Sequence, residues 1–293
     1  MSIEPVNVPA VVDTECVSFL QWALPRLRLR WAGFRKVRRQ VCKRIERRRR
    51  ALELPDLDAY RVYLEAHPAE WRVLDGLCHV TISRFSRDRA VFEFLAREVL
   101  PALARAAAES RRPFRAWSAG CASGEEPYTL VLVWEALFVT RFPDVRLEIL
   151  ATDVDGAMLA RARAARYGPS SLRELPEEWR RLGFEARQGA YHLRAELRRA
   201  VTLREHDLRT GSPDGPFDLV LCRNLAFTYF DAELQLEACS TLGGALRPGG
   251  ALVVGAHEAL PPGAHGFLPW PAGRGIYRRH ASCGEEAARE PGP

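Results

Sequence analysis

The sequence lacks the features that would mark a membrane or secreted protein. No apolar run reaches the roughly 18 residues that a membrane-spanning helix needs. The first ten residues, MSIEPVNVPA, do not have the pattern of a signal peptide. These absences predict a protein without a membrane span.

Cysteine is present, but not in a pattern typical of a metal site or a disulfide framework. The seven cysteines are odd in number, scattered along the chain and without Cys-x-x-Cys spacing. We therefore expect neither a zinc site nor a disulfide framework, and a reducing cytoplasm is the default location.

Two common nucleotide-binding loops are also missing. The segment 114–130, FRAWSAGCASGEEPYTL, reads as a strand, a turn of small residues and a helix start. It contains neither Gly-x-Gly-x-x-Gly nor the Gly-Lys-Ser/Thr of a P-loop. Its two glycines still allow close backbone approach to a ligand. Two carboxylates at the helix start would repel a phosphate, but they suit a ligand with ribose hydroxyls and a cationic amino group. S-adenosylmethionine has both.

The rest of the chain predicts an α/β fold behind a helical region. From residue 114 onward, expected strands at 115–119, 147–152, 201–205, 219–222 and 251–255 alternate with helices. Such alternation predicts a Rossmann-like parallel sheet with helices on both faces. Ligands of these sheets bind at the carboxyl ends of the strands, where the candidate motifs fall.

The expected domains follow from this pattern. A leader occupies 1–30, a small all-helical domain 31–112 and the Rossmann-like domain 113–280. Residues 168–200 interrupt the alternation and read as a small insertion, with a turn near Gln188 and Gly189. The polar residues 281–293 are expected to be a disordered tail.

The net charge of +6 is concentrated near the amino terminus. Residues 26–50 contain 13 Arg or Lys and one acid. Such a run can be a solvated helix face, a surface for an acidic protein partner or a nucleic-acid surface, with nucleic acid the least favoured. The recurrence of Val37, Val41 and Ile45 at four-residue spacing favours a helix with one buried side.

The segment Trp-Ser-Ala-Gly-Cys followed by Gly-Glu-Glu-Pro-Tyr resembles the signature of CheR-type methyltransferases. The resemblance covers roughly residues 30–260. It implies an S-adenosylmethionine-dependent enzyme that esterifies glutamate side chains of a chemoreceptor-like or unknown acidic protein. In that family an insertion placed like 168–200 forms a β-subdomain that docks some chemoreceptors, but here it is short.

The resemblance assigns candidate cofactor residues to the first two strand ends. Gly120 frames the first loop, and Glu125 is expected at the amino-acid end of the cofactor. The alternative for Glu125 is an acid matched to the helix dipole. Asp153 directly follows the second strand and is expected to hold the ribose hydroxyls, whereas Asp155 reads as a helix cap.

The third and fourth strands supply further candidates. Asp207 and Leu208 are expected at the adenine, although Asp207 could instead be a turn aspartate. The family triplet Cys-Arg-Asn is intact, which places Asn224 and Leu225 in the cofactor pocket. Tyr229 is the best tyrosine near the transferred methyl group, or an aromatic packed under the next helix. It follows Asn224 after four residues, where the family usually has three.

The segment 80–92, VTISRFSRDRAVF, resembles a family segment that faces the cofactor and substrate. Arg87 matches its catalytic arginine and Thr81 a position near the cofactor. The alternative for Arg87 is a local salt bridge with Asp88, worth under about 1 kcal/mol if exposed.

A glutamate carboxylate is ionised at neutral pH and needs no general base. The absence of an obvious histidine or cysteine base near the motifs fits such an acceptor. Two alternatives stay open: a methyltransferase of the same fold acting on a nucleic acid or small molecule, and a cofactor-binding regulatory protein without turnover. The sequence does not indicate an oligomeric state.

Overall fold

A computed structural model describes the backbone of residues 10–280 and the side chains of residues 14–280. It divides into two compact units. The helical unit comprises the chain up to Val80 together with Thr228–Asp231, and the sheet unit comprises Thr81–Phe227 and the chain from Ala232. The predicted disordered tail and Cys283 lie outside the described residues.

The helical unit is a bundle of short helices around one apolar core. Its elements are α1 (Ala10–Ala23), the 3-10 helix η1 (Leu24–Leu27), α2 (Trp31–Phe34), α3 (Arg38–Ala51), α4 (Leu57–Ala66) and α5 (Glu70–Cys78). The four-residue recurrence places Val41 and Ile45 on the buried side of α3. Asp56 caps α4 by accepting from the Ala59 amide at 2.7 Å, as the start of a helix requires.

A buried carboxylate joins three helices of this unit. Glu70 on α5 accepts from the Tyr60 hydroxyl at 2.8 Å and from Arg48 Nε and Nη2 at 2.8 and 2.7 Å. The hydrogen bond from Arg48 holds the pKa of Glu70 below its usual value. Arg48, one residue of the basic run, therefore stabilises the fold of this unit and is not a free surface charge.

The sheet unit begins with α6 (Arg89–Phe94), a π-helical turn η2 (Leu95–Val99) and α7 (Leu100–Glu109). Strands and helices then alternate. The elements are β1 (Phe114–Ala119), α8 (Glu125–Leu137), β2 (Leu147–Asp153), α9 (Gly156–Ala164), β3 (Arg166–Tyr167), η3 (Pro169–Leu172), α10 (Glu177–Gly183), β4 (Phe184–Arg187), β5 (Ala190–Leu193), α11 (Ala195–Arg198), β6 (Val201–Glu205), η4 (Leu208–Thr210), β7 (Phe217–Leu221), α12 (Ala226–Tyr229), α13 (Ala232–Ala245), β8 (Leu246–Val253), β9 (Phe267–Pro269) and β10 (Ile276–Arg279).

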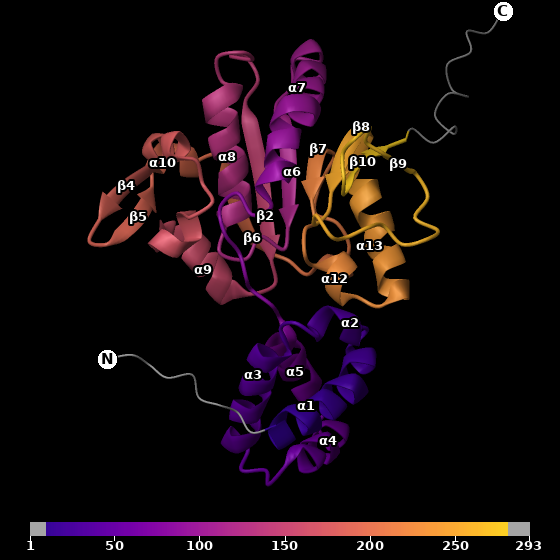
Figure 1. Ribbon diagram of the computed structural model, residues 1–293. Coiled ribbons are helices and arrows are strands. Elements are labelled where there is room, and N and C mark those ends of the chain that lie inside the picture. The colour runs from indigo at the N-terminus through magenta and orange to yellow at the C-terminus, as the bar shows by residue number, and fades with distance from the viewer. Residues whose placement is uncertain (1–9, 281–293) are drawn as a thin grey trace, which may run out of the picture. The chain divides into compact units, whose positions relative to one another are not determined.

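The main sheet has the strand order β6-β2-β1-β7-β8-β10-β9 (Figure 1). The strands from β6 to β8 are parallel, which confirms the predicted Rossmann-like fold, and β10 and β9 add an antiparallel edge that was not predicted. The chain passes from β1 outward to β2 and β6, then returns to β7 on the other side of β1. This reversal is the topological switch point where ligands of such sheets bind.

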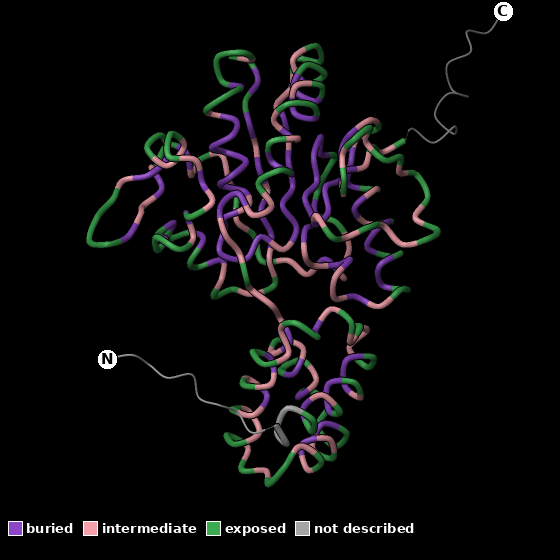
Figure 2. The backbone as a smooth tube through the Cα atoms, in the orientation of Figure 1, coloured by how far each residue is buried: buried purple, intermediate pink, exposed green. Residues whose placement is uncertain are grey.

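The insertion folds as a small antiparallel sheet of its own. Its order is β3-β5-β4, and the turn between β4 and β5 uses Gln188 and Gly189, both with positive φ. Figure 1 shows this hairpin beside α10, and Figure 2 shows its loop exposed, while the strands β1, β2, β7 and β8 of the main sheet are mostly buried.

The structure contains a disulfide that the cysteine pattern did not predict. Cys16 on α1 and Cys42 on α3 are bonded, with their Cα atoms 6.0 Å apart. The two lie 26 residues apart in sequence, so the pairing depends on how α1 packs against α3 and has no signature in the spacing. The disulfide also removes the argument from cysteine usage for a reducing compartment.

Two structural features are absent from residues 10–280. None of the helices in this range is long and apolar enough to cross a membrane. The same range contains no cluster of histidine, cysteine and acidic side chains suited to a metal ion.

Candidate functional site

The carboxyl ends of the parallel strands lie in register along one edge of the sheet. Ala119 of β1 pairs with Thr152 of β2, Asp153 of β2 pairs with Glu205 of β6, and Leu221 of β7 pairs with Val253 of β8. We call this the carboxyl edge. The loops that leave it contain most of the predicted site residues.

The first loop approaches its neighbours too closely for a side chain at Gly120. This residue has φ +79°, and a Cβ there would come within 2.5 Å of Leu225 Cδ2. The amides of Gly120 and Cys121 both donate to the Thr152 carbonyl, at 2.8 and 2.9 Å. The positive φ therefore favours glycine at this position, and the Leu225 side chain lies directly against the loop.

Asp153 fixes the shape of this loop. Its Oδ2 accepts from the Ala122 amide at 2.8 Å, and its Oδ1 accepts from the Asp155 amide at 2.9 Å. Each carboxylate oxygen can accept more than one hydrogen bond, so these contacts are compatible with further donors such as hydroxyls. Asp155 caps α9 through the amides of Ala157 and Met158, in agreement with the capping interpretation.

The two acids that begin α8 have different surroundings. Glu125 is 1% exposed, and both its carboxylate oxygens accept from the Ser123 hydroxyl at 3.0 and 2.9 Å. Glu126 accepts from the Ser118 hydroxyl at 2.7 Å and from Arg223 Nη1 at 3.2 Å. Burial raises the pKa of Glu126, and Arg223 opposes that shift. Glu125 is thus turned toward its own loop, and its role as a cofactor ligand stays a prediction.

Arg223 connects three parts of the sheet unit. Its Nη2 donates to the Arg87 carbonyl and to Asp88 Oδ2, both at 2.7 Å, while Nη1 reaches Glu126. The guanidinium lies 5.2 Å from the centre of the Phe92 ring, and the side chain is 2% exposed. The end of β7, the start of α8 and the segment before α6 are therefore tied together by one buried cation.

This tie places Arg87 at the carboxyl edge. Arg87 is half-buried, and its Nη1 donates to the Ile82 carbonyl at 2.7 Å. Its positive charge lowers the pKa of Glu126, although desolvation outweighs it. The arrangement differs from the alternative of a local ion pair, because Asp88 pairs with Arg223. Thr81 begins the same segment and is half-buried.

The ends of β7 and β8 share a carboxylate that the sequence did not single out. Glu258 Oε2 accepts from the amides of Asn224 at 2.8 Å and Gly255 at 2.6 Å. Asn224 has φ +55°, and a Cβ on Gly255 would lie 2.5 Å from Asn224 Nδ2. Glu258 thus holds the backbone of Asn224 in an unusual conformation and fixes where its amide side chain starts.

Asp207 forms a turn. Its Oδ1 accepts from the Arg209 amide at 2.9 Å, and both oxygens accept from the Arg209 guanidinium. These contacts match the alternative interpretation of a turn aspartate, and Leu208 beside it is buried. Contacts of this pair with adenine stay a prediction.

Tyr229 belongs to the group of contacts that forms the helical unit. Its ring lies 5.0 Å from that of Phe34, and its carbonyl accepts from the Arg30 amide at 2.8 Å. The ring is thus packed against an aromatic of α2, whereas the alternative interpretation placed it under the helix that follows in sequence. A position near the transferred methyl group stays a prediction.

The sequence argument missed Arg223, Glu126, Ser118 and Glu258 as organisers of this edge. The first was present in the Cys-Arg-Asn triplet, where only the asparagine was assigned a role. An arginine beside a buried strand is a usable signal, because buried cations are almost always paired. Glu258 had no such signal.

A hollow of about 440 Å³ lies elsewhere, where β1, β2 and β7 begin. Its charged lining residues are Arg115, Arg146, Glu148, Arg199, Arg204 and Asp214. None of the predicted site residues lines it, and it lies at the amino ends of the parallel strands. By the rule for open α/β sheets, the carboxyl edge remains the place for the cofactor.

The connections made by Arg223 predict its effect on stability. Arg223→Leu should lower the free energy of unfolding by about 3–5 kcal/mol, because Glu126 and Asp88 lose their common cation. Arg89→Leu is the control, since its ion pair with Glu93 is 63% and 55% exposed and worth about 0.5 kcal/mol or less. Urea unfolding measures both, and equal losses in the two variants would contradict the role given to Arg223.

Comparison with known proteins gives the same assignment as the motifs. Residues 81–270 match the family model "CheR methyltransferase, SAM binding domain". The chain is 38% identical to a "Chemotaxis protein methyltransferase" of Listeria innocua over 185 residues, which is 63% of this chain and 68% of that protein. It is 33% identical to "Probable biofilm formation methyltransferase WspC" of Pseudomonas aeruginosa over 77% of this chain and 53% of that protein.

Solved structures with the same cofactor resemble the chain only weakly. A glycopeptide N-methyltransferase in complex with S-adenosylmethionine matches 52% of this chain and 48% of its own at 16% identity, with a TM-score of 0.31. The family match therefore carries the conclusion. The chain belongs to the CheR methyltransferase family, and it is an S-adenosylmethionine-dependent methyltransferase.

Proposed function

We propose that the protein transfers the methyl group of S-adenosylmethionine to carboxylate oxygens of glutamate side chains on an acidic protein. The observation that supports this acceptor most directly is that the carboxyl edge combines a cation, Arg87, with cysteines that stay protonated at neutral pH and so cannot accept a proton. Cys121 and Cys222 are buried, and burial raises the pKa of both thiols. His206 Nε2 lies 2.9 Å from the Gly211 carbonyl and so acts as a donor there.

The residues at the carboxyl edge fit this cofactor. The first loop is close-packed at Gly120, so its backbone rather than a side chain would face a ligand. The residues that would hold the cofactor are Thr81, Arg87, Gly120, Glu125, Asp153, Asp207, Leu208, Asn224 and Leu225. When bound, the cofactor's sulfonium supplies an electrophilic methyl group.

The protein's contribution to the reaction is orientation and removal of water. A glutamate side chain with a pKa of about 4.3 is already an anion at neutral pH, so no proton has to be removed. The guanidinium of Arg87 can bind a carboxylate through two parallel hydrogen bonds and align it for displacement. Tyr229 is the proposed second contact. Excluding water around the aligned carboxylate would supply the rest of the rate gain.

The basic run at residues 26–50 offers a surface for the acceptor protein. Arg39, Lys43 and Arg47 recur every four residues on α3, are exposed and have no ion pair with any residue from 14 to 280. We call them the basic stripe. Other cations of the run are committed: Arg48 binds Glu70, and Arg49 binds Glu46. The stripe is suited to an acidic, chemoreceptor-like protein, and we place the reaction in the cytoplasm.

The cofactor assignment predicts a loss of affinity in Asp153→Ala. Binding of S-adenosylmethionine should weaken at least about tenfold, because a hydrogen bond to a charged group is worth about 1.5–3 kcal/mol and the Ala122 amide also loses its acceptor. Asp155→Ala is the control: it should cost about 1 kcal/mol of stability through its cap and leave affinity nearly unchanged. Calorimetric titration reads both. Unchanged affinity in Asp153→Ala would remove this residue from the pocket.

The proposed chemistry predicts a base-labile product that depends on Arg87. Arg87→Ala should reduce turnover by about a hundredfold through loss of alignment while keeping most of its thermal stability. Arg87→Lys should recover little, because lysine lacks the planar fork. Arg84→Ala, which removes a partly exposed ion pair with Glu174 in the same segment, is the matched control.

Transfer of a tritiated methyl group to protein, followed by mild alkali, is the measurement. Esters release their label in alkali, and N-methyl groups retain it. Retained label would reject the ester and favour a nucleic-acid or amine acceptor. Cofactor binding without any transfer would favour the regulatory protein without turnover.

The basic stripe predicts an effect on acceptor recognition alone. The triple variant Arg39→Gln, Lys43→Gln, Arg47→Gln should raise the KM for an acidic acceptor several-fold at low salt and leave kcat unchanged. The difference should shrink at high salt, because exposed charges are screened. A triple change of the exposed Arg105, Arg199 and Arg204 to glutamine gives the same change in net charge as a control. Equal effects of the two triple variants would show that net charge, and not the position of the basic stripe, determines the KM.

A further inference from the structure

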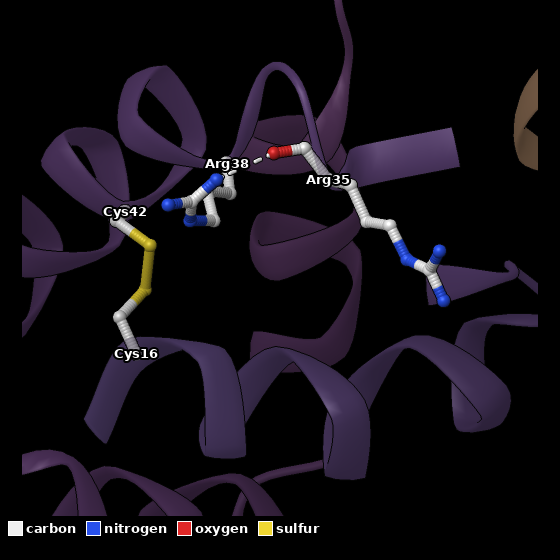
Figure 3. The surroundings of a disulfide bond; sticks show 4 residues. All are labelled: Cys16, Arg35, Arg38 and Cys42. Carbon is white, nitrogen blue, oxygen red and sulfur yellow. Dashed lines mark hydrogen bonds between the residues drawn. A yellow bond between two sulfur atoms is a disulfide. The ribbon is translucent and has the colours of Figure 1, made fainter. Parts of the chain in front are cut away.

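The helical unit contains a covalent link that the proposed function does not use. The Cys16–Cys42 disulfide joins α1 to α3, the helix that carries the basic stripe (Figure 3). We propose that this pair is a reversible thiol–disulfide exchange site, and that its oxidation state sets how firmly the start of α1 is held against α3.

The other described cysteines do not compete for this chemistry. Cys78, Cys121, Cys222 and Cys239 are free and buried. Burial raises the pKa of Cys78 and Cys239 to about 12 and that of the other two thiols as well. A thiol reacts as its thiolate, so these four are inert at neutral pH. Within residues 14–280, redox chemistry is confined to the bonded pair.

The two cysteines of the pair differ in exposure. Cys16 is 2% exposed, whereas Cys42 is partly exposed on α3. Thiol–disulfide exchange requires in-line approach of a thiolate to one sulfur, and access decides which one is attacked. In the proposed exchange, the incoming reductant therefore attacks the sulfur of the more exposed residue, Cys42, and releases Cys16.

Basic residues flank Cys42 along α3. Arg38 lies one helical turn before Cys42, and Figure 3 draws its guanidinium on the side of that residue, with Nη1 donating to the Arg35 carbonyl at 2.8 Å. Arg39 and Lys43 are exposed on the same helix. The nearby acid, Glu46, is engaged by Arg49 and Arg50. Such surroundings attract an anionic thiolate and stabilise the thiolate of Cys42 once it forms.

The reductant proposed is a protein dithiol of the Cys-x-x-Cys class. One of its thiolates attacks Cys42 Sγ, a new S–S bond forms, and the bond to Cys16 breaks. Cys16 leaves as a thiolate and takes a proton. The second thiol of the reductant then attacks the mixed disulfide, which releases Cys42. Two electrons and two protons pass to the pair, and the reductant becomes a disulfide. The reverse exchange with the oxidised form of such a protein restores the bond.

The position of the bond explains what reduction would change. After Cys16, α1 is anchored by Phe19 and Leu20, both fully buried, whereas Thr14 and Glu15 before it are exposed. Cutting the bond leaves these apolar anchors in place and removes the covalent tie between α3 and the part of α1 before Phe19. The constraint on the unfolded chain is lost as well, since the bond closes a loop spanning 26 positions. Reduction should therefore loosen α1 without unfolding the unit.

Differential alkylation of the full-length protein tests the exchange. In the oxidised protein, Cys16 and Cys42 should resist iodoacetamide. After treatment with a Cys-x-x-Cys dithiol protein without denaturant, both should be alkylated while the four buried cysteines stay protected. Arg38→Gln should slow alkylation of reduced Cys42 several-fold, and Arg105→Gln should not. Free Cys16 and Cys42 in the oxidised protein, or a bond that the dithiol opens only in urea, would overturn the exchange site.

Hydrogen exchange and thermal unfolding test the control of α1. Reduction should speed amide exchange at the start of α1 at least tenfold and lower the Tm of the helical unit by on the order of 10 °C. The double variant Cys16→Ser, Cys42→Ser should match the reduced protein under both oxidising and reducing conditions. A bond that opens with neither change would overturn the structural half of the proposal.

Any effect of the disulfide on methyl transfer rests on the proposed function. The measurements below distinguish failure of that function from failure of the exchange site. Reduction should change the KM for an acidic acceptor and leave affinity for S-adenosylmethionine unchanged. Absence of transfer in both oxidation states would reject the proposed function, while alkylation still decides the exchange site. Equal KM values in the oxidised and reduced protein would show that the Cys16–Cys42 pair does not affect acceptor recognition, and would contradict its link to the basic stripe.

Discussion

The buried guanidinium of Arg223 is the interaction on which the carboxyl edge depends. It lies at the end of β7 and meets the Arg87 carbonyl, Asp88 and Glu126 at distances of 2.7 to 3.2 Å. A charge that is 2% exposed is tolerated only because carboxylates and a carbonyl surround it. The segment before α6 has little regular structure of its own, so this cation helps to fix where Arg87 stands relative to the strand ends, together with the Ser86 amide, which donates to Thr129 Oγ1 at 3.1 Å.

Carboxylates perform the same task at the other loops. Asp153 holds the Ala122 amide, and Glu258 holds the amides of Asn224 and Gly255. Each acid fixes a backbone turn that a regular strand or helix could not make. The edge is therefore preorganised, which is what an enzyme needs when its task is to align two reactants rather than to move a proton.

Local patterns were sufficient to predict the parallel strands of the sheet, because short apolar runs after Phe114 mark the alternation of strands and helices. The start of β8 was missed because Pro248, Gly249 and Gly250 read as a turn, although they lie inside Leu246–Val253. The strands β9 and β10 have three and four residues, too few to show a period. The partners of Asp153 and Cys16 lie 31 and 26 residues away and depend on packing, which no spacing reveals.

The account holds that a cation and a preorganised edge direct the methyl group to a carboxylate oxygen. The most direct test uses S-adenosylmethionine with a ¹³C-labelled methyl group, a glutamate-rich acceptor protein and NMR of the product. The account predicts a methyl resonance of the ester type, which disappears after mild alkali. A methyl resonance on nitrogen, stable to alkali, would contradict it.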